Sequence, residues 1–162
     1  MTSKADFSEQ EWTRLKRAPF VAGMAISLAD PGGPIELVKE TAATLRTVRE
    51  AAGSGAREEL IGALAQEVAG EARQRENPLH GFKPKGALAG QEILEELAEV
   101  NRIVSAKATP EEAAAYRGWL QAAAQEAASA AKEGGFMGFH AERVSEGEQR
   151  MLDELAKVLS AS

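Results

Sequence analysis

Apolar residues recur every three or four positions through most of the chain, and breaks in that pattern divide it into about six segments. The breaks contain proline and glycine clusters, which stop helices; the clearest are Asp30-Pro31-Gly32-Gly33-Pro34, Gly53-Ser54-Gly55 and Gly134-Gly135. β-branched residues stand singly and do not alternate with polar ones, so strands are not expected. The pattern predicts an all-α chain, folded as a bundle or orthogonal array of about six helices.

Capping signals predict where three of the helices begin. Each has the Ser/Thr-x-x-Glu spacing of a capping box: Ser8–Glu11, Thr109–Glu112 and Ser145–Glu148. Phe7 precedes the first box and is expected to pack on Trp12 as a hydrophobic staple.

The first predicted helix runs from Ser8 to Ala29 and is expected to kink or restart at Pro19, because proline lacks an amide hydrogen and crowds the preceding turn. The next three run from Pro34 to Gly53, from Ala56 to Arg73 and from Ala87 to Lys107, and the last two follow Thr109 and Ser145. Inward-facing positions include Trp12, Leu15, Ile35, Val38, Ala42, Leu45, Val48, Leu60, Leu64, Val68, Ile93, Leu97, Val100, Val104, Trp119, Leu120, Ala123, Ala127, Leu155 and Leu159.

Length and composition narrow the classes of protein. A chain of 162 residues fits a single domain, 1–162, with a core that needs neither disulfides nor a structural metal. The absence of cysteine excludes disulfides and thiolate chemistry. A net charge of −6 argues against binding to nucleic acid or to an anionic membrane.

The start of the chain and its most apolar segment bear on localisation. The first residues lack the positive flank and apolar run of a signal peptide. The longest apolar stretch, Ala18 to Ala29, is shorter than the roughly 20 residues that span a bilayer and suits a central helix of a bundle. We therefore expect a cytoplasmic protein.

Two segments resemble a known family. The segment FSEQEWTRLKRAPFVAGMAISLADPGGPI resembles the opening of the tellurite-resistance TerB-like bacterial proteins, with a long apolar helix, a turn and a second helix. VSEGEQRMLDEL is similar to helix starts in the same family. The resemblance implies an all-helical cytoplasmic protein with a metal-binding or stress-response role. The acidic turn of that family falls on Asp30, which here is followed by Pro-Gly-Gly-Pro and not by glycine and further acidic residues.

Three carboxylates around this turn are the candidate metal ligands. Asp30 lies in the turn, and Glu36 and Glu40 share one face of the following helix. Such oxygens suit a divalent cation, although the spacing is not that of an EF-hand. The alternative is structural: Asp30 accepts hydrogen bonds from amides of the turn, and Glu36 complements the positive end of the helix.

The two histidines lie in loops that also contain glycine and phenylalanine. Neither histidine follows a glutamate by three positions, which argues against a di-iron site, and zinc would lack ligands. Apolar side chains in loops either tuck back or meet a partner. The candidate interaction residues are His80, Phe82, Phe136, Met137, Phe139 and His140. In the alternative, the apolar ones plug the ends of the bundle.

The remaining charged groups suggest no chemistry. The carboxylates of Glu92, Glu95, Glu96 and Glu99 are expected to form a solvated helix face. Lys83 does not lie in a phosphate-binding loop, and no nucleophile elbow is present.

The leading interpretation is therefore a non-catalytic interaction or scaffold protein that binds another protein or a second copy of itself. One alternative is a metal-responsive or stress-linked TerB-like protein. Another is a small-ligand-binding protein or enzyme with a pocket between loops 79–85 and 136–140, where a histidine beside a carboxylate would act as a base. The balance favours a protein that is not an enzyme and has no cofactor.

Overall fold

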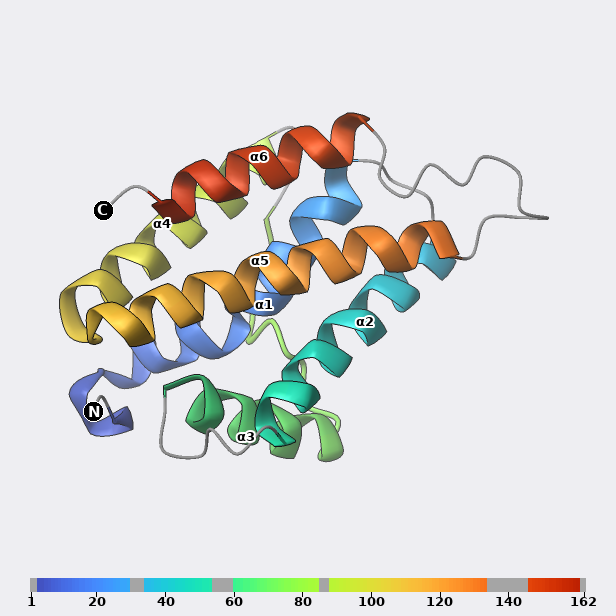
Figure 1. Ribbon diagram of the computed structural model, residues 1–162. Helices are drawn as coiled ribbons and strands as arrows, with labels where there is room; N and C mark the ends of the chain where they lie inside the picture. Colours follow the sequence, from blue (N-terminus) through green and yellow to red (C-terminus); the bar gives the residue numbers. More distant parts are fainter. Residues whose placement is uncertain (1–2, 30–33, 54–59, 85–87, 134–145, 161–162) are drawn as a thin grey trace.

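A computed structural model of the chain confirms the all-α prediction: the residues that it describes form six α-helices and one short 3₁₀-helix, with no strand among them. These residues are 3–29, 34–53, 60–84, 88–133 and 146–160, without the side chains of 34–40, 51–53 and 131–133. The elements are η1 (Lys4–Asp6), α1 (Glu9–Ala29), α2 (Pro34–Gly53), α3 (Leu60–Arg73), α4 (Ala89–Lys107), α5 (Pro110–Glu133) and α6 (Glu146–Ser160) (Figure 1).

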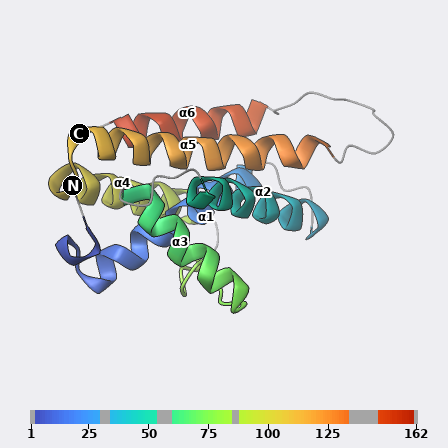
Figure 2. The same ribbon diagram turned by 60° about the horizontal axis from the view of Figure 1, so that its bottom comes forward.

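Helices α1 and α5 form the centre of the fold, and each contacts all the other helices. In Figure 1, α5 crosses the middle of the molecule with α6 antiparallel beside it, α1 lies behind it, and α3 lies below. The turned view in Figure 2 again places α6 alongside α5. Among the described helices, none combines the length and the apolar character needed to cross a lipid bilayer.

The core draws side chains from all six helices, and most of the predicted inward positions are buried. One face of α5 carries the fully buried alanines Ala123, Ala124, Ala127 and Ala128, and such small side chains allow neighbouring backbones to approach closely. The prediction for Ala42 was wrong: it is exposed, and Ala43 and Thr44 are buried in its place. Alanines at consecutive positions satisfy a helical spacing equally well, so the pattern could not choose between them.

Two of the three predicted capping boxes lie in the described residues. At the start of α1, the amide of Ser8 donates to Glu11 Oε1 at 2.8 Å, and the amide of Glu11 donates to Ser8 Oγ at 3.1 Å. The rings of Phe7 and Trp12 pack with centroids 5.7 Å apart, which confirms the staple. At α5, the amide of Glu112 donates to the Thr109 hydroxyl at 3.2 Å. Ser145 lies outside the described residues.

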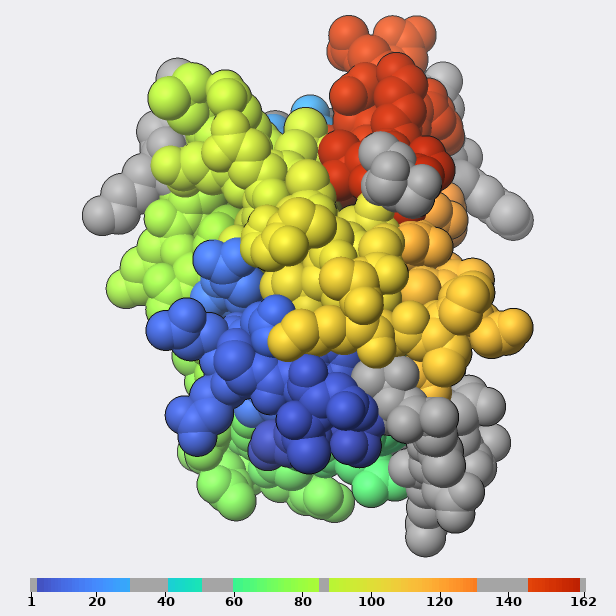
Figure 3. Space-filling model, turned by 90° about the vertical axis from the view of Figure 1, so that its left-hand side faces the viewer, coloured from blue at the N-terminus to red at the C-terminus, as the bar shows by residue number. Residues whose placement is uncertain are grey.

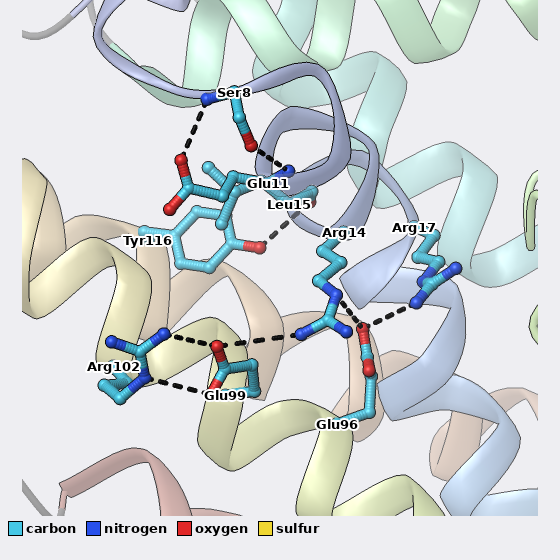
Figure 4. A network of polar contacts seen from close by, with 9 residues as sticks. All are labelled: Ser8, Glu11, Arg14, Leu15, Arg17, Glu96, Glu99, Arg102 and Tyr116. Atoms are coloured by element: carbon cyan, nitrogen blue, oxygen red, sulfur yellow. Dashed lines mark hydrogen bonds and ion pairs between the residues drawn. The ribbon is translucent and has the colours of Figure 1, made fainter.

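Helix α1 continues through Pro19, so of the two expected outcomes the restart was wrong, and a kink there stays a prediction. Proline at this position leaves the carbonyl of Leu15, four residues earlier, without its helical amide donor. The hydroxyl of Tyr116 on α5 donates to that carbonyl at 2.9 Å (Figure 4). The contact between α1 and α5 thus supplies the hydrogen bond that the α1 backbone lacks.

Candidate functional site

Two adjoining cavities lie where α1, α2 and the segment after α3 meet. The larger, of about 260 Å³ and here called the α1–α2 cavity, is lined by uncharged side chains among the residues that the structure describes. These include Phe20, Met24, Ser27, Thr44, Pro78 and Leu79. The smaller, of about 180 Å³, extends towards α3. Phe20, Thr41 and Pro78 line both cavities.

Gly23 allows α1 and α2 to approach each other closely beside the larger cavity. Gly23 lines it, and a β-carbon there would lie 2.8 Å from Thr44 Oγ1. Thr44 is itself only 1% exposed, so it has little room to move away. The two helices are therefore close at Gly23, while the apolar side chains of Phe20 and Met24 form the adjoining wall.

Residues 76–82, here called the strap, close one side of both cavities through two successive turns. The amide of His80 donates to the carbonyl of Asn77 at 3.2 Å, with Pro78 at the favoured second position of the turn. The amide of Phe82 then donates to the carbonyl of Leu79 at 2.9 Å. His80 and Gly81, between them, have φ angles of 48° and 84°, as a type I′ turn requires.

These turns direct the predicted residue His80 back onto α3. Its Nε2 lies 2.9 Å from Glu71 Oε2, and Glu71 Oε1 lies 2.5 Å from Lys16 Nζ on α1. Phe82 is the next predicted residue. The guanidinium carbon of Arg17 lies over its ring, 5.1 Å from the ring centroid. Both side chains thus contact this chain's own residues, and binding of a partner by them stays a prediction.

A second carboxylate on α3 ties the start of the chain to this region. Glu67 accepts hydrogen bonds from Trp12 Nε1 at 2.6 Å and from Lys4 Nζ at 2.9 Å. Burial raises the pKa of Glu67, but these hydrogen bonds and the charges of Lys4 and Lys16 outweigh it, so the pKa lies below the ordinary value of 4.5. Glu67 therefore stays ionised in the folded protein at neutral pH.

The predicted solvated face of α4 is only partly solvated. Glu92 and Glu95 are exposed, but the prediction was wrong for Glu96, which is 9% exposed. The reason is that α1 packs on α4 and covers it. Glu96 Oε1 lies 2.8 Å from Arg17 Nη2 and 3.8 Å from Arg14 Nε, and these charges compensate its burial (Figure 4). 

Glu99 completes this network on the side of the molecule where α1 lies against α4 (Figure 3). Arg102 Nε donates to it at 2.9 Å, and Arg14 lies 3.7 Å away (Figure 4). The hydrogen bond from Arg102 holds the pKa of Glu99 below its ordinary value. A shallow groove runs along these carboxylates. Because arginines already neutralise Glu96 and Glu99, the uncharged α1–α2 cavity is the stronger candidate site.

Several predicted residues lie outside what the structure describes. They are Asp30 and the four loop residues Phe136, Met137, Phe139 and His140. Glu36 and Glu40 lie on α2, but their side chains are not described. Within the described part of the chain, no three acidic or histidine side chains form a group that could hold a metal ion.

Sequence reasoning missed most of the cavity. It singled out the segment that contains Leu79 and His80, but not Gly23, Met24 or Thr41. A glycine in an otherwise apolar helix was the one available signal, since it often marks a close approach of helices. Neither a protein-family model, nor a curated protein, nor a solved structure matches this chain.

Proposed function

We propose that this protein binds a small, uncharged and largely apolar molecule in the α1–α2 cavity. The observation that carries the proposal is the described part of the lining. It has apolar walls from Phe20, Met24 and Leu79 and polar edges from neutral side chains, and none of its described side chains is charged. Pockets that bind small molecules combine such walls with a few polar groups.

The volume of the cavity supports a ligand of one or two rings. An engineered cavity of about 150 Å³ takes up benzene, and this one is larger at about 260 Å³. Phe20 offers a ring for stacking, and the thioether of Met24 adapts to aromatic surfaces.

The charges around the cavity favour a neutral ligand. An ion in the cavity would lose its hydration and gain no charged partner among the described lining residues, which is costly. Two carboxylates, those of Glu71 and Glu76, line the smaller cavity, and Glu71 already binds Lys16 and His80. A neutral molecule with one hydrogen-bonding group fits best.

Calorimetry with 2-naphthol tests the proposal, with measurements at two temperatures because apolar binding changes the heat capacity. We expect a dissociation constant below about 1 mM, which corresponds to about −4 kcal/mol. Thr41→Phe places a ring in the space that both cavities share and should weaken binding at least about tenfold.

Ala42→Phe is the matched control, because Ala42 is the exposed neighbour on α2 and lines neither cavity. It should bind as the wild type does. An absence of heat at both temperatures, or equal binding by the two variants, would overturn the proposal.

A further inference from the structure

In the strap, the residues that line the cavity are directly followed by His80, whose side chain contacts Glu71. Asn77, Pro78 and Leu79 line the α1–α2 cavity, and His80 follows them directly. We infer that the hydrogen bond between His80 and Glu71 is a latch that holds the strap against the cavity, and that its release opens the path by which a small ligand enters. This inference rests on the proposed function, since it concerns access to the same cavity.

Hydrogen bonds within the turn join the cavity wall and His80 into one unit. The amide of Leu79 donates to Asn77 Oδ1 at 2.9 Å, and the amide of His80 donates to the carbonyl of Asn77. Because these bonds lie within the turn, the turn can move as a body without losing them. A displacement of His80 therefore moves the cavity wall with it.

Glu71, the partner of His80 in the latch, is held in place by other contacts. Glu71 belongs to α3, and the oxygen that does not contact His80 binds Lys16 on α1. Lys16 is buried and also lies 3.9 Å from Glu67. Since Glu71 is held by a second helix, it cannot follow the strap outward, and opening must break its contact with His80.

The backbone of the strap depends on this side-chain contact. His80 has a φ of 48°, in the left-handed region that costs a residue with a β-carbon free energy. Arg75, just before the strap, has a φ of 59°. Such conformations persist where surrounding contacts enforce them. Without the latch, the segment loses a contact that holds it in this shape.

The far end of the strap has an anchor of its own. Phe82 lies under Arg17, which is also bound to Glu96 on α4. These contacts involve neither His80 nor Glu71. Opening at the latch can therefore leave Phe82 in place and confine the movement to the residues before it, with loss of the hydrogen bond from the Phe82 amide to the Leu79 carbonyl.

His80→Asn tests the latch, because asparagine accepts the left-handed conformation but is too short to keep the ring's contact with Glu71. The readouts use protein with ¹³C-labelled methionine methyl groups and the neutral nitroxide TEMPOL, whose collisions broaden accessible methyl signals. We expect TEMPOL to broaden the Met24 methyl more in His80→Asn than in the wild type, with Met151 on α6 unchanged as the internal reference. The dissociation rate of 2-naphthol should rise about tenfold, the effect of losing one good hydrogen bond.

Lys83→Asn is the control on the same loop, since Lys83 is exposed and outside the latch, and it should behave as the wild type. Glu71→Asp shortens the other partner while keeping the charge for Lys16, and it should reproduce the effect if His80→Asn does not fold. If 2-naphthol binds the wild type but neither variant changes the Met24 signal or the rate, the latch is wrong and the proposed function stands. If 2-naphthol does not bind but TEMPOL reaches Met24 in the variants alone, the proposed function falls and the latch stands.

Discussion

The hydroxyl of Tyr116 donates to the carbonyl of Leu15, the one carbonyl of α1 that Pro19 leaves without its helical donor. Both residues are fully buried. Burial raises the pKa of Tyr116 well above its ordinary value, and the negative charge of Glu96 adds to this effect. The phenol is therefore protonated throughout the physiological range and remains a donor.

Tyr116→Phe should lower the free energy of unfolding by about 1–3 kcal/mol, because it leaves the Leu15 carbonyl buried without a donor. In a Pro19→Ala background, the amide of residue 19 can take over as donor, so the same change should cost at least about 1 kcal/mol less. Denaturant unfolding of the four proteins in this double-mutant cycle measures the difference. Additive effects of the two substitutions would show that the hydroxyl does not compensate for the proline.

Gly23→Ala should destabilise the protein by about 1–3 kcal/mol, despite the better helix propensity of alanine, because the new β-carbon would meet Thr44 Oγ1 at 2.8 Å. Gly118 on α5 gives a matched control, since nothing lies within 4 Å of a β-carbon there. Gly118→Ala should therefore stabilise by about 0.5–1 kcal/mol. Thermal unfolding of both variants checks the pair, and a stabilised Gly23→Ala would contradict the close approach of α1 and α2.

Glu67→Gln should make stability less dependent on pH in the acid range. The pKa of Glu67 is lower in the folded state than its ordinary value of 4.5, so ionised Glu67 stabilises the protein above that pH. The contribution disappears as the pH falls through the folded-state pKa. Urea unfolding at a series of pH values should give the wild type a higher free energy of unfolding than the variant at neutral pH. The difference between the two free energies should decrease below about pH 4.5. A constant gap would contradict the stabilisation of the carboxylate by Lys4 and Trp12.

The elements of the fold could be predicted from local signals. The capping box at Ser8 and the proline and glycine residues after Ala29 predicted the two ends of α1 closely, because caps and helix breakers act within a few residues. The continuity of α1 through Pro19 could not be predicted. The carbonyl that Pro19 leaves without a donor is bonded by Tyr116, which is about a hundred positions away and gives no local sign that its hydroxyl meets α1.

The candidate site could not be predicted from local signals either, because it is formed by segments that are far apart in the sequence. Phe20, Thr41 and Leu79 belong to three segments, and only the packing of α1, α2 and the strap brings them to one cavity. The burial of Glu96 likewise follows from how α1 crosses α4, while its spacing on α4 fits a solvated face equally well. Periodicity identifies which face of a helix is apolar, but not which partner covers it.

The proposal that the α1–α2 cavity holds a small apolar ligand is tested most directly by the methyl signals of ¹³C-labelled methionine during a titration with 2-naphthol. Met24 lines the cavity, and Met151 on α6 does not. We predict that the Met24 signal shifts and saturates, because an aromatic ring beside the methyl group changes its shielding, while the Met151 signal stays in place. A Met24 signal that does not move, or signals of Met24 and Met151 that drift together without saturation, would contradict the account.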